Sequence, residues 1–69
     1  MIEILLNGES KRLGEPCSAE DLVQQLDLVG KRIAMEINEE ILPRSLYSEY
    51  QFKAGDRVEV VHAVGGGAH

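Results

Sequence analysis

The sequence has one cysteine and no long apolar run, and each absence excludes a class of protein or site. With Cys17 alone among 69 residues, the chain can form neither an internal disulfide nor a metal site built from cysteines. No stretch of about 18 consecutive apolar residues is present, so we expect no transmembrane helix. The amino-terminal residues lack the basic region of a signal peptide, and we therefore expect a cytoplasmic protein.

Positive charge is also scarce. The chain has 7 Lys and Arg residues against 12 Asp and Glu residues, which gives a formal net charge of −5. This charge argues against binding to nucleic acid or to an anionic membrane, and it favours a protein partner with a basic docking surface. A chain of 69 residues forms one small domain with a thin core, which leaves little room for a deep enclosed active site.

The amino-terminal residues predict a β-hairpin. Ile2–Leu6 is a short apolar strand, and Glu9–Leu13 is a more polar strand with one face exposed to water. Asn7-Gly8 between them is a two-residue turn, because both residues tolerate positive φ.

A helix of two to three turns is expected after the hairpin. Ser18 is expected to be its N-cap, and Asp21, at the third helical position, gives a weak form of the capping box. Leu22, Val23 and Leu26 lie at helical spacing and form an apolar stripe. A helix this short can cover a sheet only by packing across one face.

The second half of the chain predicts three further strands. The expected elements are a strand at Ile33–Ile37, a turn at residues 38–40, a short strand at residues 41–42 ended by Pro43, an irregular stretch through residues 46–52, a turn at residues 54–56 and a last strand at residues 57–63. This order fits an α+β fold of the β-grasp type, in which a mixed sheet of four to five strands wraps around one main helix. The first and last strands are then parallel neighbours at the centre, joined by a right-handed crossover. Another small α+β sandwich is the alternative.

A run of glycines follows the last strand. We divide the chain into a β-grasp domain over residues 1–63 and a flexible glycine-rich tail over residues 64–69. Gly65, Gly66 and Gly67 have no side chain, so the tail can pass through a narrow channel into the active site of another protein. The chemistry would then take place at a terminal carboxyl group. A frayed terminus explains the same residues, because domain ends are commonly disordered.

Five segments together resemble a known family. They are Leu6-Asn7-Gly8-Glu9, the Asp-Leu-Val-Gln-Gln-Leu of residues 21–26, the Ala-Met-Glu-Ile-Asn of residues 34–38, the Ile-Leu-Pro-Arg of residues 41–44, and residues 55–67. The chain, apart from Ala68-His69, resembles the small sulfur carriers of the ubiquitin-like superfamily, and most of all the ThiS family of thiamin thiazole synthesis. The sister family, the small subunit of molybdopterin synthase, usually has an aromatic residue and prolines where this chain has Val-His-Ala-Val at residues 61–64.

This resemblance implies a mechanism in which the protein is a co-substrate and not an enzyme. An E1-like enzyme would adenylate the carboxylate of Gly67 with ATP and Mg²⁺, and the carrier itself would bind no cofactor. Sulfur from a cysteine desulfurase would displace AMP and leave a thiocarboxylate, which thiazole synthase accepts. Here the Gly67 carboxyl is part of an amide to Ala68, so Ala68-His69 must first be removed. A protease-trimmed cap, a cloning remnant and a role without sulfur chemistry are the alternatives.

Several side chains are candidates for contact or catalysis. If Val58 and Val60 face the helix, Val61 and Ala63 face outward and, with Val64, form a docking patch for a partner. A ubiquitin-like interaction module without covalent chemistry is the competing function, and a carrier for another sulfur pathway, of the molybdopterin or cysteine type, is a third.

Two further side chains could belong to a free-standing enzyme. Cys17 could be a nucleophile and His62 a base, but a lone loop cysteine is more often merely tolerated. His62 and His69 could ligate a metal, but no third ligand lies near them in the sequence, so we expect no metal site and expect His62 to be a solvent-facing strand residue.

Overall fold

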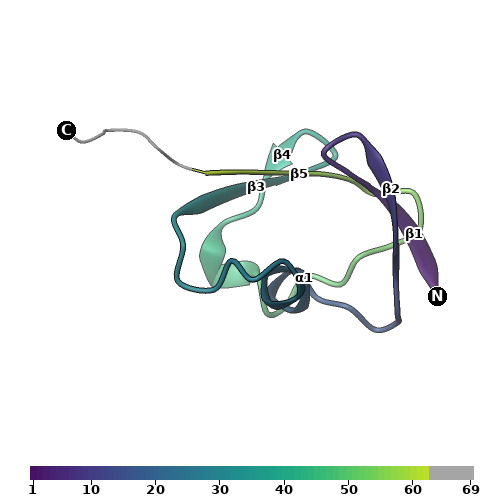
Figure 1. The fold of residues 1–69 in the computed structure, drawn as a ribbon, viewed down its shortest axis with the longest axis horizontal. Coiled ribbons are helices and arrows are strands. Elements are labelled where there is room, and N and C mark those ends of the chain that lie inside the picture. Colours follow the sequence, from purple (N-terminus) through teal and green to yellow (C-terminus); the bar gives the residue numbers. More distant parts are fainter. Residues whose placement is uncertain (63–69) are drawn as a thin grey trace.

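The computed structural model describes residues 1–62, in which one sheet packs against a single α-helix (Figure 1). The elements in chain order are β1 (Ile2–Leu6), β2 (Glu9–Leu13), α1 (Ala19–Gln25), β3 (Ile33–Ile37), β4 (Glu40–Ile41), the 3₁₀ helix η1 (Arg44–Leu46) and β5 (Arg57–His62). Within residues 1–62 no helix is long and apolar enough to cross a membrane.

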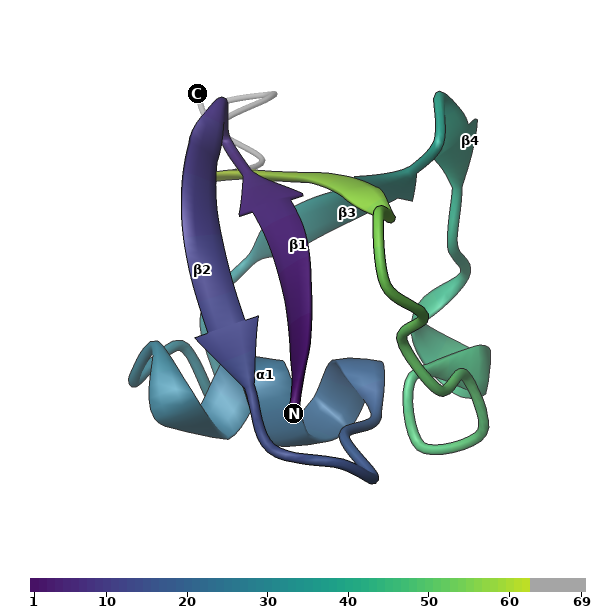
Figure 2. The ribbon, with the colours of Figure 1, turned by 90° about the vertical axis from the view of Figure 1, so that its right-hand side faces the viewer.

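The sheet has the strand order β2-β1-β5-β3-β4. β1 and β5 run parallel, whereas the pairs β1–β2, β3–β5 and β3–β4 are antiparallel. Figure 2 shows α1 on one side of this sheet, with β1 and β2 in front of it. The first and last strands are therefore interior neighbours, and the β-grasp expectation is confirmed.

The β1–β2 hairpin forms because its turn residues accept positive φ. Asn7 has φ of 51° and Gly8 has φ of 85°, as a type I′ turn requires. The turn fixes the register, in which Leu6 faces Glu9 and Ile2 faces Leu13. This register places Ile2, Ile4 and Leu13 on the face that packs against the helix, whereas Leu5 lies on the other face.

Helix α1 begins with the predicted capping box. The Asp21 N–H donates to Ser18 Oγ at 3.0 Å, and the Ser18 N–H donates to Asp21 Oδ2 at 3.0 Å. Leu22 and Val23 are buried, and Leu26, the C-cap residue, is half-buried. The helix thus buries the expected apolar stripe under the sheet.

The core is built from both hairpin strands, the helix and the two central strands that follow it. Its fully buried side chains are Ile4, Leu13, Leu22, Met35 and Val58. Burial of each such side chain contributes about 1.5–3 kcal/mol, a large share for a domain of this size. Val60 is half-buried beside them, so the expected inward face of β5 is confirmed.

Strand β4 differs from the sequence expectation by one residue. Asn38 and Glu39 form a two-residue turn with φ of 53° and 74°, and Glu40 already pairs with Ile37. The expected three-residue turn and the strand at residues 41–42 were therefore wrong in their bounds. A glutamate at positive φ is uncommon, and the sequence carries no signal for it. Leu42 still donates its N–H to the Met35 carbonyl at 2.9 Å.

The stretch between β4 and β5 is more ordered than its sequence indicates. It contains η1, and it buries Tyr47 and Phe52 in the core. Main-chain bonds attach it to the start of α1: the Phe52 N–H donates to the Cys17 carbonyl, and the Ala19 N–H donates to the Tyr50 carbonyl, both at 3.0 Å. This segment closes the end of the core that the sheet leaves open.

Candidate functional site

The candidate site is the end of β5 and the sheet face beside it. The predicted reactive residue Gly67 lies outside the described residues, as do Gly65, Gly66, Ala63 and Val64. The structure places the strand that leads to them, and this strand ends at His62, five positions before Gly67. What the fold contributes to any chemistry at Gly67 is therefore the position of β5 and the surface around it.

Alternation along β5 separates a core face from an exposed face. Val58 is buried and Val60 is half-buried, whereas Glu59 and Val61 are exposed, Val61 by 56 %. His62 is exposed as well, as expected. The outward orientation predicted for Val61 is confirmed.

Strand register brings further exposed or half-buried side chains to the same side of the sheet as Val61. Ala34 lies opposite Val61, Glu36 opposite Glu59, Ile41 opposite Glu36, and Leu5 opposite Arg57. We call the surface formed by Leu5, Ala34, Glu36, Ile41, Arg57, Glu59 and Val61 the outer face. Leu5, Ile41 and Val61 are exposed by 43 %, 69 % and 56 %. Apolar side chains thus surround an acidic centre on a sheet face that no helix of the described chain covers.

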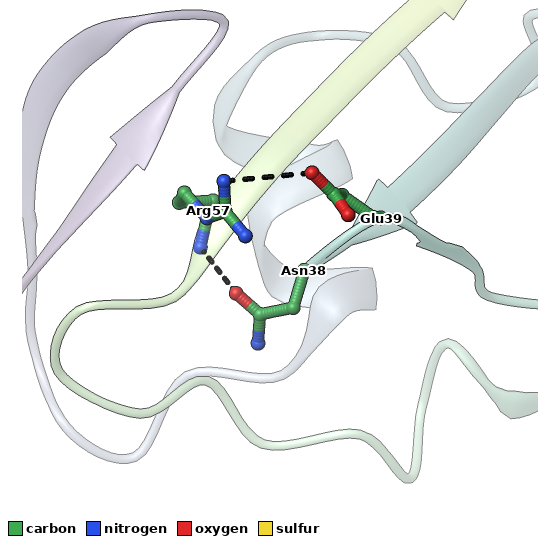
Figure 3. Close-up of polar contacts among 3 residues, drawn as sticks. All are labelled: Asn38, Glu39 and Arg57. Carbon is green, nitrogen blue, oxygen red and sulfur yellow. Dashed lines mark hydrogen bonds and ion pairs between the residues drawn. The ribbon is translucent and has the colours of Figure 1, made fainter.

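The acidic centre of the outer face has an unfavourable charge arrangement. Glu36 and Glu59 are direct cross-strand neighbours, and like charges in such positions repel each other. Arg57, at the start of the strand, pairs with Glu39 across 3.7 Å instead, and both side chains are largely exposed (Figure 3). These four residues line one small recess. A cation from a partner would therefore relieve repulsion that the free protein contains.

A polar network fixes the start of β5. Asp56 is buried, and it accepts hydrogen bonds from the Tyr50 hydroxyl at 2.7 Å, the Lys53 N–H at 2.9 Å and Asn38 Nδ2 at 3.1 Å. Burial alone would raise the pKa of Asp56, but these hydrogen bonds outweigh it and hold the pKa below its ordinary value. Burial, followed by the bond to Asp56, raises the pKa of Tyr50 to about 12. At neutral pH the pair is a carboxylate and a neutral hydroxyl.

Two turn asparagines hold β5 from opposite sides. Asn38, after β3, accepts from the Arg57 N–H at 2.9 Å through its side chain and donates its own N–H to the Arg57 carbonyl at 2.7 Å (Figure 3). Asn7, after β1, accepts from the Val60 N–H at 2.9 Å and donates Nδ2 to the Val60 carbonyl at 3.2 Å. The strand is therefore clamped at its beginning and again near its end.

The side chains considered for a free-standing enzyme do not form a catalytic arrangement. Cys17 is buried, and its contacts are the Ser18 carbonyl at 3.7 Å and Gln25 Nε2 at 3.8 Å. Burial, assisted by the nearby charge of Asp21, raises the pKa of the Cys17 thiol, which disfavours the nucleophilic thiolate. Among residues 1–62, no group of three or more His, Cys, Asp and Glu side chains is placed to hold a metal ion.

Sequence reasoning missed Asn7, Asn38 and Asp56 as residues that position β5. Asn7 was expected only as a turn residue, and its side-chain partner lies 53 positions away in the sequence. The available signal was the occurrence of asparagine directly after a strand, where positive φ and a short amide side chain are both useful. That signal predicts the turn but not the partner.

The chain is similar to one protein family over nearly its whole length. The model of the ThiS family matches residues 4–67. The uncharacterized protein ycf40 of Porphyra purpurea is 41 % identical over 66 residues, covering 96 % of this chain and 93 % of that protein. The sulfur carrier protein ThiS of Escherichia coli is 26 % identical over 66 residues, covering 96 % of this chain and all of that protein.

Two further similarities concern an enzyme and a solved structure. A thiazole synthase of Paramagnetospirillum magneticum is 31 % identical over 67 residues, and the match covers 97 % of this chain but only 21 % of that enzyme. The crystal structure of the thiamine biosynthesis protein ThiS from Geobacter metallireducens superimposes with a TM-score of 0.82 at 26 % identity, covering 96 % of this chain and 100 % of that one.

Proposed function

Because this chain belongs to the ThiS family, we propose that it carries sulfur as a thiocarboxylate on Gly67 for the formation of the thiamin thiazole. The observation that carries the proposal is that the family match extends through the glycine run and has Gly67 as its last residue. The similarity to a sulfur carrier of Escherichia coli and to the solved ThiS structure supports the same assignment.

Hydrolysis of the Gly67–Ala68 peptide bond first frees the Gly67 carboxylate and releases Ala68-His69. The proposed chemistry then has two steps at the carboxyl carbon of Gly67. The Gly67 carboxylate attacks the α-phosphorus of ATP on an E1-like enzyme, which forms an acyl-adenylate and releases pyrophosphate. A hydrosulfide equivalent, obtained from a cysteine desulfurase, then attacks the carbonyl carbon, and AMP leaves. Mg²⁺ and ATP belong to the activating enzyme, and the protein contributes only position. The need for ATP is consistent with a cytoplasmic site of action.

The outer face is the proposed docking surface for the activating enzyme. It adjoins the end of β5, so an enzyme bound there lies close to the segment that contains Gly67. Its exposed Ile41 and Val61 supply apolar area, and Glu36 and Glu59 favour a partner with a basic group between two apolar ones. The formal net charge of −5 favours the same kind of partner.

Thiazole synthase is the proposed acceptor of the sulfur. Two proteins with that name contain a stretch similar to nearly all of this chain within about a fifth of their own length. When a carrier and an acceptor are parts of one chain, they meet at a high effective concentration. That arrangement supports an association between the separate proteins as well.

Ala68-His69 make the proposal testable with the protein itself. A chain ending at Gly67 and the chain ending at His69 are each incubated with ATP, an E1-like enzyme and a sulfur donor, and their intact masses are measured. We expect the Gly67-ended chain to gain the mass of one oxygen-to-sulfur exchange, and the longer chain to remain unmodified, because an amide cannot form an acyl-adenylate. If an activating enzyme that is active on its own carrier leaves the Gly67-ended chain unmodified, a non-covalent interaction module becomes the better description.

A further inference from the structure

The β1–β5 ladder contains an irregularity at the position where the hairpin turns away. Main-chain bonds join the strands at Leu5, whose N–H donates to the Asp56 carbonyl at 2.9 Å, and at Asn7, whose N–H donates to the Val58 carbonyl at 2.8 Å. In a regular parallel ladder the next bonds, to Val60, would come from main-chain groups of β1. Here the main chain enters the turn at Asn7, with φ of 51°, and β1 does not continue beside Val60.

The Asn7 side chain takes the place of that missing strand. Its Oδ1 accepts from the Val60 N–H at 2.9 Å, and its Nδ2 donates to the Val60 carbonyl at 3.2 Å. A carboxamide has the same donor and acceptor as a peptide group, so one side chain reproduces both halves of a ladder contact. Val60 is thereby held on the β1 side although β1 has already ended.

The contact between Asn7 and Val60 lies near the end of β5, where the strand leads toward Gly67. Because Val60 directs both main-chain groups toward Asn7, it forms a non-hydrogen-bonded pair with Met35 of β3, and the bonds to β3 alternate with it. Asn7 is then what holds this rung of β5 from the β1 side, two residues before β5 ends at His62. Beyond this rung β5 is paired with β3 alone, through Ala34–Val61 and Ile33–His62.

We propose that Asn7 is a positioning residue for the proposed sulfur-carrier reaction, because its carboxamide fixes the end of β5 and so the direction in which the segment bearing Gly67 leaves the domain. This inference rests on the proposed function. A displacement of about 1 Å at a reacting group can slow an enzymatic step about a hundredfold. β3 pairs with β5 as far as His62, and on the β1 side Asn7 alone holds the strand near its end. The Asn7 side chain is therefore a control point for activation at Gly67.

The test uses two matched variants of the carrier ending at Gly67. Asn7→Gly and Asn38→Gly each remove an asparagine at positive φ from a strand-ending turn, and glycine accepts the same backbone conformation, with φ of 51° and 53° in the protein. Each variant loses bonds to β5, but Asn38 contacts the start of the strand and Asn7 contacts its end. If Asn7 has a purely structural role, the kcat of each variant should fall only as far as its loss of stability explains.

Two measurements separate positioning from stability. In Asn7→Gly, the Val60 amide should exchange about tenfold faster than the loss of global stability alone explains. In Asn38→Gly, the exchange rate of the Val60 amide should change only as the global stability changes. Steady-state adenylation by an E1-like enzyme should show kcat lowered about tenfold in Asn7→Gly with KM within about twofold. The loss of kcat in Asn38→Gly should be smaller at a comparable loss of stability, because that variant keeps the contact to Val60. Asn7→Asp keeps the acceptor and loses the donor, and its kcat should lie between those of the wild-type and Asn7→Gly carriers.

Each contrary outcome has a distinct meaning. If the wild-type carrier is not adenylated by an enzyme that adenylates its own carrier, the proposed function fails and the inference fails with it. If the wild-type carrier is adenylated and Asn7→Gly retains its kcat, or if the Val60 amide keeps its protection, only the positioning role is overturned. Equal loss of kcat in Asn7→Gly and Asn38→Gly at equal loss of stability also overturns it.

Discussion

The Asp56 carboxyl joins the turn after β3 to the segment directly before β5, and its contacts have a pH-dependent consequence. Its folded pKa is lowered by the bonds from Lys53, Tyr50 and Asn38, which outweigh the effect of burial. A carboxyl of this kind stabilises the fold above its unfolded pKa, and the stabilisation is lost as the pH falls through its folded pKa. The wild-type free energy of unfolding should therefore decline below about pH 4.

Asp56→Asn isolates this contribution. At neutral pH we expect it to lower the free energy of unfolding by about 1–3 kcal/mol, because buried partners lose a charged acceptor. Below about pH 4 it should lose less stability than the wild type does. Urea unfolding followed by circular dichroism at neutral and acidic pH measures both effects, and Glu49→Gln, at an exposed position, is the control. Equal acid sensitivity of Asp56→Asn and the wild type would contradict the argument.

Val61 is expected to contribute to binding a partner and not to the stability of the core. It is 56 % exposed on the outer face, so Val61→Asp should change the free energy of unfolding by about 1 kcal/mol or less. The same substitution should weaken binding to the activating enzyme about tenfold or more, because it places a charge in the apolar part of the docking surface. Calorimetry of unfolding and of binding separates the two effects. Extensive unfolding with unchanged affinity would place the docking surface elsewhere.

Among the elements, the central strands should be the most protected. β5 lies between β1 and β3, and Val58 in β5 and Ile4 in β1 are almost completely buried. We expect amide exchange to be slowest in β1 and β5 and faster in β2 and β4, which form the edges of the sheet. Native-state hydrogen exchange tests this order. Fast exchange throughout Val58–Val61 would be incompatible with a central β5.

The elements that the sequence predicts correctly are those with their own local signals. The Asn7-Gly8 turn, the Ser18 cap and the alternation of Val58 to Val61 each depend on neighbouring residues, and each is present in the structure. The bounds of β4 were wrong because Glu39 adopts a positive φ that its residue type disfavours. The helix η1 was missed because its segment is ordered by contacts with α1 and Cys17, not by local periodicity.

Only part of the candidate site could be predicted from the sequence. Val61 could be placed on the exposed face from alternation alone, and Gly67 could be assigned only through family resemblance. The asparagine contacts to Val60 and Arg57 could not be predicted, because a side chain that bonds across 53 or 19 positions has no signature in either local segment. Such a contact can be predicted only when the register of β5 with its neighbouring strands is known.

At the scale of the whole molecule, charge should control the rate of docking. The chain has a formal net charge of −5, and the outer face has Glu36 and Glu59 side by side. Association with a basic partner should slow as salt rises, because the Debye length falls from about 10 Å at 0.1 M to about 3 Å at 1 M.

Glu59→Gln should lower the association rate constant about two- to fivefold at low salt and change the dissociation rate less, because an exposed charge acts mainly on encounter. Stopped-flow binding to the activating enzyme at several salt concentrations measures both constants. Glu20→Gln, at an exposed residue on α1, on the opposite side of the sheet, is the matched control. An equal effect of the two substitutions would assign the steering to net charge and not to the outer face.

The pairing of β1 with β5 also determines when the protein can fold during its synthesis. The bonds between Asn7 and Val60 span 53 positions, so the central contact of the sheet joins opposite ends of the domain. At about 5–20 residues per second, a ribosome completes β5 several seconds after β1. During that interval the hairpin and helix have no central neighbour, and the outer face does not exist. We therefore expect that a nascent or truncated chain without β5, which lacks Arg57, Glu59 and Val61 of the outer face, does not bind the proposed activating enzyme. Folding would then restrict activation to chains that contain the strand leading to Gly67.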